Sequence, residues 1–333
     1  MKRAVIGGGS WGTALASVLA YHGDVVLWAR DQAVVNSINQ HHHNCKYQSD
    51  LKLPENLKAT HSLAEAVSDA DLLLLVVPSH VMRKIAIECI PYLKTGVQIV
   101  SASKGIEIDS LMTMEEVLSQ EFPRAFRSDL SFLSGPSFAR ETIEKQATAV
   151  TVAARFPDVA SEIQQLITTP YFRIYTTEGV TGVELGGALK NVIAIASGVA
   201  DGLSLGHNTR AALITRGVAE ITRLAVKLGA NPLTLSGLSG MGDLILTCTG
   251  GLSRNRRVGV ELGKGKSLEE IINAMHEVAE GVKTAKSAYE LAQREIVEMP
   301  ITKEVFNMLY RQKSPVESLW DLMGRNLKGE RDY

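Results

Sequence analysis

The chain has 333 residues, of which 45% are hydrophobic and 21% charged, and its formal net charge is −1. Such a length suits two globular domains, and the balanced charge gives no sign of binding to nucleic acid or to a membrane surface. Three scattered cysteines, Cys45, Cys89 and Cys248, fit a reducing compartment and provide neither a disulfide framework nor a CxxC zinc site. The N-terminal apolar stretch is too short for a signal peptide, and no apolar run approaches the roughly 18 residues of a membrane span. We therefore expect a cytoplasmic protein without a metal site or a membrane span.

The first half of the chain alternates short apolar runs with helical patterns. Strands are predicted at residues 4–6, 25–28, 72–77, 99–101, 130–133, 149–153 and 172–175, with a weaker one at 58–60. Helical patterns lie between them, at residues 13–21, 32–39, 81–90 and 111–121. Near-continuous apolar strands that alternate with helices predict a mainly parallel sheet covered on both faces. We expect a doubly wound α/β domain of the Rossmann type over residues 1–178.

After residue 178 the strand patterns stop, and apolar residues recur at helical spacing. Helices are predicted at residues 178–200, 210–228, 268–275, 284–295 and 301–310. We therefore expect an all-α second domain over residues 179–333. Residues 40–56 form one long polar loop within the first domain.

A glycine turn, Gly7-Gly8-Gly9-Ser10-Trp11-Gly12, lies between the first strand and the first helix. Gly7, Gly9 and Gly12 fit G-x-G-x-x-G in the strand–helix context that dinucleotide binding requires. Gly7 permits a sharp turn, Gly9 has no Cβ to block a pyrophosphate, and Gly12 allows close packing of helix on strand. The alternative is a tight strand–helix turn in another kind of α/β protein. We predict that a nicotinamide dinucleotide binds here.

The residues after the second strand bear on the choice between NAD and NADP. An acidic residue there accepts a hydrogen bond from the 2′-hydroxyl of NAD, whereas an arginine can pair with the 2′-phosphate of NADP. The strand is followed by Arg30 and then Asp31, and Asp31 could instead cap the next helix. We predict that NADP is preferred and that NAD is possible.

A nicotinamide enzyme that reduces a carbonyl must protonate the oxygen as hydride reaches the carbon. In the second domain, Gly186, Gly187 and Lys190 share one helix face. Glycine inside a helix costs about 1 kcal/mol, a cost that makes sense if cofactor or substrate lies against the backbone. The alternative is a surface lysine beside a helix–helix contact, and spacing alone leaves the two interpretations even.

Eight ordered blocks of sequence point to one family. They are the glycine turn with Thr13-Ala14-Leu15, Val77-Pro78-Ser79-His80, Ser103-Lys104-Gly105, Ser134-Gly135-Pro136-Ser137-Phe138-Ala139, Glu184-Leu185-Gly186-Gly187-Ala188-Leu189-Lys190-Asn191, Gly242-Asp243-Leu244, Ser253-Arg254-Asn255-Arg256 and Val278-Ala279-Glu280-Gly281. With these blocks the chain resembles the bacterial NAD(P)-dependent glycerol-3-phosphate dehydrogenase family over essentially its full length.

The resemblance implies reversible reduction of dihydroxyacetone phosphate to sn-glycerol 3-phosphate, a role in phospholipid synthesis, and a homodimer. It makes Lys190 the proton donor or acceptor at the C2 oxygen of the substrate. It places Lys104 at the same site, in contact with substrate and cofactor, and has Asp243 balance the charge and orient Lys190. The alternative for Asp243 is a helix cap, because this residue precedes an apolar run.

By the same resemblance, Ser253, Arg254 and Asn255 hold the phosphate of the substrate. Arginine offers a planar fork that matches phosphate, and the neighbouring side chains add neutral donors. A solvated basic helix face is the alternative, and Arg256 and Arg257 are taken as surface residues. The other substrate contacts implied by the resemblance are Gly135, Ser137 and Asn191. The cofactor contacts comprise Gly7, Gly9, Ser10, Trp11, Gly12, Arg30, Tyr47, Lys104, Ala139, Arg254, Val278 and Glu280.

The tract His41-His42-His43 lacks a carboxylate or cysteine partner at ligand spacing, and we interpret it as part of the polar loop. Two other functions remain open on the sequence. One is a different dehydrogenase with this layout, such as a β-hydroxyacid dehydrogenase or a ketopantoate reductase. The other is a regulator that binds NAD(P) without catalysis.

Overall fold

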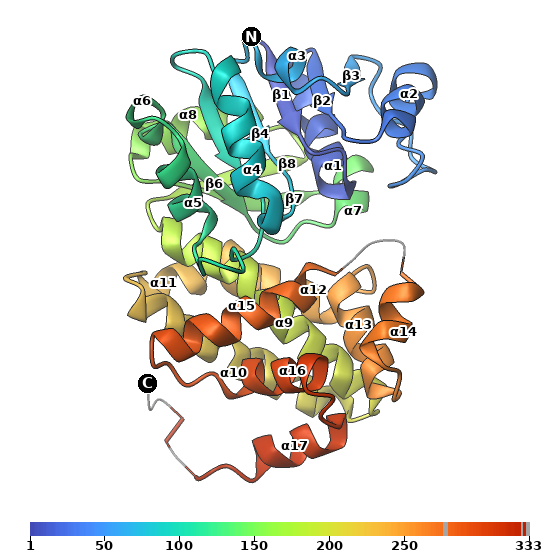
Figure 1. Ribbon diagram of the computed structural model, residues 1–333, viewed down its shortest axis with the longest axis vertical. Coiled ribbons are helices and arrows are strands. Elements are labelled where there is room, and N and C mark those ends of the chain that lie inside the picture. Colours follow the sequence, from blue (N-terminus) through green and yellow to red (C-terminus); the bar gives the residue numbers. More distant parts are fainter. Residues whose placement is uncertain (276–278, 328, 331–333) are drawn as a thin grey trace. The chain divides into compact units, whose positions relative to one another are not determined.

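The computed structural model describes residues 1–275, 279–327 and 329–330 (Figure 1). The chain forms two compact units: the sheet unit, Met1–Lys104 with Met112–Val183, and the helical unit, Gly105–Leu111 with Glu184–Tyr333. The boundary lies a few residues beyond the predicted one, because it falls inside the first turn of a continuous helix, Val180–Gly202. The assignment of Gly105–Leu111 to the helical unit was not predicted. It follows from the packing of Ile106 in the core of that unit.

Eight strands form one sheet in the order β3-β2-β1-β4-β5-β6-β7-β8. They are β1 (Arg3–Ile6), β2 (Val25–Trp28), β3 (Leu57–Thr60), β4 (Leu72–Leu75), β5 (Gln98–Ser101), β6 (Leu130–Ser134), β7 (Thr148–Ala154) and β8 (Phe172–Thr177). Neighbouring strands are parallel except for the antiparallel pair β6 and β7. The structure thus confirms the predicted strands and the mainly parallel sheet.

Helices cover both faces of this sheet (Figure 1). One face packs against α1 (Ser10–Leu19), α2 (Gln32–His41) and α8 (Pro157–Ile167), and the other against α3 (Leu63–Val67), α4 (Ser79–Cys89) and α5 (Met114–Glu121). The short helices α6 (Arg124–Arg127) and α7 (Ala139–Ile143) and the 3-10 turns η1 (Ala20–His22) and η2 (Ile90–Tyr92) complete the unit. Helix α5 begins later than predicted because Thr113 and Glu116 form a capping box at its start.

The order of the strands reverses between β1 and β4. The chain runs from β1 outward to β3 on one side, and from β4 outward on the other. Ile6, Leu75 and Ser101 are in register across β1, β4 and β5, so these strands end together. Ligands of doubly wound sheets bind where the strand order reverses, outside the carboxyl ends of the strands. The glycine turn follows β1 and Lys104 follows β5, so both lie at this edge.

The helical unit is built around α9 (Val180–Gly202). This helix is long and apolar enough to span a membrane by length and composition, but 94% of that stretch is buried, as expected of a core helix. The structure confirms the five predicted helices with shifted ends. Besides α9, the helical unit contains α10 (Gly206–Lys227), α11 (Pro232–Leu235), the π-helical turn η3 (Leu238–Gly242), α12 (Asp243–Thr249), α13 (Arg254–Gly263), α14 (Leu268–Asn273), α15 (Glu280–Arg294), α16 (Pro300–Tyr310) and α17 (Pro315–Met323).

Helices α9 and α13 approach each other closely at paired glycines. A Cβ atom on Gly198 would overlap the carbonyl oxygen of Arg256, and one on Gly259 would overlap a carbonyl oxygen of α9. Gly202 and Gly263 meet in the same way one turn further along, with a Cβ on Gly263 2.9 Å from the Cα of Gly202. The contact fixes the middle and the C-terminal end of α13 against the last turns of α9.

We expect Gly259→Ala to lower the free energy of unfolding by about 3 kcal/mol, because the added methyl group forces two helix backbones apart. Urea unfolding followed by circular dichroism measures the change. Gly251→Ala is the matched control, because a Cβ at this position has no described atom within 4 Å. It should shift the free energy by less than about 0.5 kcal/mol. Equal losses in the two variants would contradict the close contact.

A buried glutamate of α10, Glu220, accepts hydrogen bonds from the start of α16. Glu220 accepts hydrogen bonds from the backbone N–H of Ile301 at 2.6 Å and from the N–H and hydroxyl of Thr302 at 3.2 Å. These N–H groups belong to the first turn of α16, which has no intrahelical acceptor for them. Burial raises the pKa of Glu220 from 4.5 to about 7, although these hydrogen bonds and the charge of Arg223 oppose the shift.

The stability of the helical unit should therefore fall as the pH rises from 4.5 to about 7. The unfolded chain releases this proton at the lower pH, so ionisation favours unfolding throughout that range. Since each pKa unit corresponds to about 1.4 kcal/mol, the loss should be on the order of 3 kcal/mol. Urea unfolding at several pH values should show this slope in the wild type and a flatter one in Glu220→Gln. An unchanged slope in the variant would contradict the assignment.

Candidate active site

The turn after β1 has the geometry that dinucleotide binding requires. Gly7 has a φ of 130°, and a Cβ there would overlap the carbonyl oxygen of Val76. A Cβ on Gly12 would overlap the carbonyl oxygen of Gly7, so α1 packs directly on the turn. A Cβ on Gly9 would have no described atom within 4 Å, and Gly9 has no side chain to cap the first N–H groups of α1. The turn therefore offers a helix N-terminus to a pyrophosphate.

The first residues of α1 are the predicted cofactor contacts Ser10 and Trp11. The indole Nε1 of Trp11 is buried and has no hydrogen-bond partner among the described residues. A buried donor without an acceptor is uncommon in folded proteins, and a bound ligand oxygen could satisfy it. The residues present at the turn therefore fit a dinucleotide.

The two residues that bear on the choice between NAD and NADP, Arg30 and Asp31, follow β2. Asp31 caps α2, and its carboxylate accepts from the N–H of Ala33 at 2.8 Å. This confirms the capping role that the sequence left open for Asp31. Arg30 is exposed, and Lys46 from the polar loop forms an ion pair with Asp31.

Asn44 fixes the polar loop to the glycine turn, a role that the sequence did not predict. It is fully buried, and its Nδ2 donates to the carbonyl oxygen of Gly8 at 3.0 Å and to the hydroxyl of Thr13 at 2.8 Å. Its Oδ1 accepts from the backbone N–H groups of Lys46 at 3.2 Å and Tyr47 at 3.1 Å. Tyr47, a predicted cofactor contact, is thereby held beside the turn.

The three histidines lie at the end of α2. His41 is the last helical residue, and His42 ends the helix in the left-handed conformation. The rings of His41 and His43 stack with centroids 5.8 Å apart. Among the described residues, no group of three His, Cys, Asp or Glu side chains is placed to hold a metal ion.

Lys104 is brought together with two predicted substrate contacts at the carboxyl ends of β5 and β6. Its Nζ donates to the carbonyl oxygen of Gly135 at 3.3 Å, and the hydroxyl of Ser137 donates to the same oxygen at 2.9 Å. Gly135 has a φ of 150°, and a Cβ there would lie 2.8 Å from the Cα of Val150. Ala139, a predicted cofactor contact, follows as the first residue of α7.

In the helical unit, Lys190 of α9 forms an ion pair with Asp243, the first residue of α12. Both side chains are buried, with exposed fractions of 7% and 1% for the two residues. Asp243 has helical backbone angles and the N-cap of α12 is Gly242, so the alternative prediction that Asp243 is an N-cap is wrong. A buried ammonium group needs such a counter-charge, since an unpaired buried charge is strongly destabilising.

The backbone that carries Asp243 packs directly on α9. A Cβ on Gly186 would lie 2.7 Å from the carbonyl oxygen of Ser239, which belongs to the π-helical turn η3. Gly186 is thus explained by helix packing, and not by a ligand against the backbone as the sequence suggested. Because η3 leads directly into Asp243, this contact fixes the carboxylate relative to Lys190. Single π-helical turns of this kind often occur at functional sites.

A chain of hydrogen bonds links three helices next to this ion pair. The Nδ2 of Asn255 donates to the Oδ1 of Asn191 at 2.9 Å, and the N–H of Gly281 donates to the Oδ1 of Asn255 at 2.9 Å. The link joins α9, α13 and the start of α15, where Glu280 lies. The second amide hydrogen of Asn255 has no hydrogen-bond partner among the described residues, so it can be donated to a ligand. Val278, another predicted cofactor contact, lies outside the described residues.

The start of α13 presents the predicted phosphate-binding residues. Ser253 is buried and caps the helix, with its hydroxyl accepting from the N–H of Arg256 at 3.2 Å. Arg254 is the first residue of the helix and is exposed. Arg256 is half-buried and pairs with Asp201 of α9 at 2.7 Å, so its interpretation as a surface residue is wrong. Arg257 is exposed, as expected.

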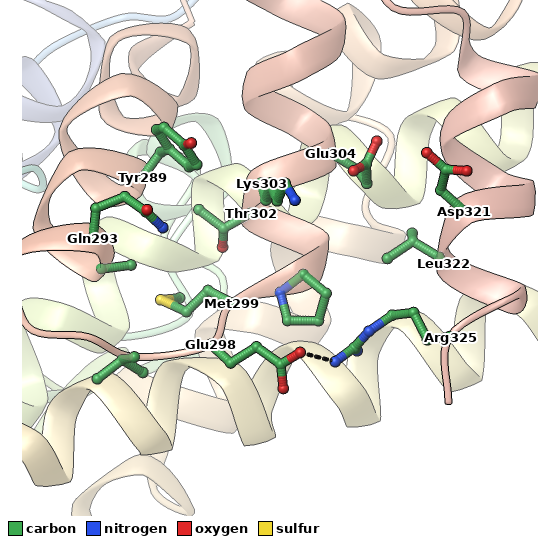
Figure 2. A pocket seen from close by; sticks show the side chains of 13 residues that line it. Tyr289, Gln293, Glu298, Met299, Thr302, Lys303, Glu304, Asp321, Leu322 and Arg325 are labelled. Atoms are coloured by element: carbon green, nitrogen blue, oxygen red, sulfur yellow. Dashed lines mark hydrogen bonds and ion pairs between the residues drawn. The ribbon is translucent and has the colours of Figure 1, made fainter. Parts of the chain in front are cut away.

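A cavity of about 310 Å³ lies elsewhere in the helical unit (Figure 2). It is lined by side chains of α15, α16 and α17, among them Tyr289, Lys303 and Asp321, and Glu298 and Arg325 form an ion pair at it. None of the predicted site residues lines it. The cavity is therefore separate from the candidate site.

Comparison with known proteins assigns the chain to a family. The model of the NAD-dependent glycerol-3-phosphate dehydrogenase N-terminus matches residues 2–160, and the model of the C-terminus matches residues 179–319. A glycerol-3-phosphate dehydrogenase (NAD(P)+) of Leptospira biflexa is 53% identical over 331 residues, which are 99% of each chain. The chain belongs to the NAD-dependent glycerol-3-phosphate dehydrogenase family. The resemblance inferred from the eight sequence blocks is confirmed.

Solved structures agree with this assignment. A glycerol-3-phosphate dehydrogenase of Coxiella burnetii has 36% identity and a TM-score of 0.92, and the match covers 97% of this chain and 99% of that one. A ketopantoate reductase of Ralstonia eutropha has 14% identity and a TM-score of 0.62, with coverage of 96% and 100%, so the likeness shows the fold alone. As a member of the glycerol-3-phosphate dehydrogenase family, the protein is an NAD(P)-dependent oxidoreductase.

Proposed function

We propose that this protein reduces dihydroxyacetone phosphate to sn-glycerol 3-phosphate with NADPH or NADH, and catalyses the reverse reaction. The observation that carries the proposal is the buried ion pair of Lys190 and Asp243, linked through Asn191 and Asn255 to the start of α13. This arrangement puts a proton donor and an anion-binding helix start in one unit. A phosphorylated ketone needs both.

Lys190 supplies the proton in this proposal. A dinucleotide whose pyrophosphate is held at the glycine turn would supply hydride to the C2 carbon of the ketone. The Lys190 ammonium group donates a proton to the C2 oxygen, so the C=O bond becomes CH–OH. Asp243 holds that ammonium group in place and balances its charge. In the reverse direction, neutral Lys190 accepts the proton from the hydroxyl.

The phosphate of the substrate binds at the start of α13. The guanidinium group of Arg254 is the charged donor, and the N-terminal end of this ten-residue helix adds a favourable dipole. Ser253 and the remaining amide hydrogen of Asn255 are the neutral groups there. We assign Lys104, Gly135 and Ser137 to the substrate as well. Ala139, Tyr47 and Glu280 are assigned to the cofactor, as is Val278.

We also propose a cofactor preference, a cellular compartment, an oligomeric state and a metabolic role. Arg30 supports a preference for NADP over NAD. The three free cysteines support a reducing compartment, for which we propose the cytoplasm. The family supports a homodimer and a supply of glycerol backbone for phospholipids.

A substrate panel tests the proposal. With NADPH in excess, the purified protein should consume the cofactor with dihydroxyacetone phosphate and not with ketopantoate. With NADP+ in excess, it should not reduce the cofactor with a β-hydroxyacid. Turnover of ketopantoate without turnover of dihydroxyacetone phosphate would support the related reductase instead. Cofactor binding without turnover of any of these compounds would indicate a regulator.

A further inference from the structure

Three charged side chains, two from the residues after β2 and one from the polar loop, bear on the choice of cofactor. Arg30 is exposed, Asp31 caps α2, and Lys46 of the polar loop forms an ion pair with Asp31. The side chains of Lys46 and Asp31 are 51% and 39% exposed, so solvent and ligands can reach both. The hydrogen bond from Lys46 lowers the pKa of Asp31, and Asp31 in turn raises the pKa of Lys46. Both side chains therefore stay charged at neutral pH.

The position of Lys46 is set by the backbone and not by the ion pair alone. The buried side chain of Asn44 accepts from the N–H of Lys46 and donates to the glycine turn. Next in the chain, the thiol of Cys45 donates to the carbonyl oxygen of Ala33 in α2 at 3.6 Å. The two residues that precede Lys46 thus fasten the loop, Asn44 to the glycine turn and Cys45 to α2 near Asp31.

The position of Lys46 is relevant because, in a doubly wound sheet, the residues after β2 determine whether NAD or NADP is preferred. A free acidic side chain there accepts from the 2′-hydroxyl of NAD and repels the 2′-phosphate of NADP. In this chain the acidic residue is Asp31, and one of its carboxylate oxygens accepts from the N–H of Ala33 while the other accepts from Lys46. The cationic groups that remain, Arg30 and Lys46, outnumber the one carboxylate.

We propose that Lys46 is a second specificity-determining residue for the cofactor. Together with Arg30 it binds the 2′-phosphate of NADP, and by pairing with Asp31 it withdraws the carboxylate that would favour NAD. The inference rests on the proposed function and deepens it. Exposed ion pairs hold their partners weakly and an ammonium group has three N–H donors, so Lys46 can contact a phosphate while it still pairs with Asp31.

Direct binding measurements test this without turnover. Isothermal titration of 2′,5′-ADP and 5′-AMP compares a ligand with the 2′-phosphate and one without it, and NADPH and NADH provide the same comparison in full cofactors. Lys46→Gln should weaken 2′,5′-ADP and NADPH about 10-fold, as for the loss of a charged hydrogen bond, and should leave 5′-AMP and NADH unchanged or tighter. Lys46→Arg should retain the wild-type preference.

Two further variants make the test specific. Lys52→Gln removes another exposed lysine of the same loop, which pairs with Glu55, and should change neither affinity. In Lys46→Gln/Asp31→Asn the carboxylate is gone while asparagine can still cap α2, so NADPH should remain weak if Lys46 contacts the phosphate. Full recovery of NADPH binding in this double variant would overturn the direct contact.

The outcomes separate this inference from the function on which it rests. A wild-type protein that binds neither NADPH nor NADH would refute the proposed function. A wild-type protein that binds both, with the same ratio of affinities in Lys46→Gln, would overturn the role of Lys46 alone.

Discussion

Replacing Lys190 with methionine should lower kcat for the reduction of dihydroxyacetone phosphate by about 10³-fold. A positioned general acid typically contributes 10²- to 10⁴-fold, and methionine keeps the unbranched side chain but has no proton to give. NADPH binding should persist, because the glycine turn lies in the other unit of the chain. Steady-state kinetics, together with fluorescence titration of NADPH, separates the loss of chemistry from a loss of cofactor binding.

The variant needs controls, because it removes the lysine that balances the charge of the buried Asp243. An unpaired buried charge can cost about 3 to 5 kcal/mol of stability. Lys190→Met/Asp243→Leu removes both charges, so it should regain stability while kcat stays low. Lys227→Met removes an exposed lysine at the end of α10 and should leave kcat unchanged. A kcat in Lys190→Met within about 10-fold of the wild type would mean that another group donates the proton.

Replacing Arg254 with alanine should raise KM for dihydroxyacetone phosphate about 10²-fold. The guanidinium group at the start of α13 makes a charged hydrogen bond to the phosphate, and losing about 3 kcal/mol corresponds to a change of this size. At saturating NADPH, the rate with unphosphorylated dihydroxyacetone should not change, because that compound has no phosphate to bind. Initial rates over a range of both substrates measure the two effects.

Arg257→Ala is the matched control for this variant. Arg257 lies on the same helix and is exposed, but it is past the residues at the helix start. Its KM should match that of the wild type. An equal rise of KM in both variants would show that general positive charge, and not the site at Arg254, attracts the substrate.

Much of the fold could be predicted because the local patterns are strong. The four leucines of β4 are all buried, and such an apolar run is typical of a strand covered on both faces. The conformation of Gly7 and the packing of Gly12 follow from the spacing of the glycine turn, and the structure has both. The boundary between the units could be predicted less well, since no local pattern shows that Ile106 joins the helical core.

In the site, too, interactions between neighbours in the sequence could be predicted, and interactions between residues far apart in the chain could not. The capping of α2 by Asp31 is a local interaction that the sequence allows. The roles of Asn44 and Arg256 depend on partners such as Gly8 and Asp201 that are distant in the chain. One buried asparagine in a polar loop carries no periodic signal. Likewise, the glycine at position 186 reveals a close approach but not whether a ligand or another helix makes it.

The most direct test of the central claim compares dihydroxyacetone phosphate with dihydroxyacetone as the oxidant of NADPH. The two ketones share the reacting carbonyl and differ in the phosphate that we assign to Ser253, Arg254 and Asn255. The proposed function predicts a kcat/KM at least about 10²-fold higher for the phosphorylated ketone, with sn-glycerol 3-phosphate as the product. Equal kcat/KM values for the two ketones, or no oxidation of NADPH with either, would contradict it.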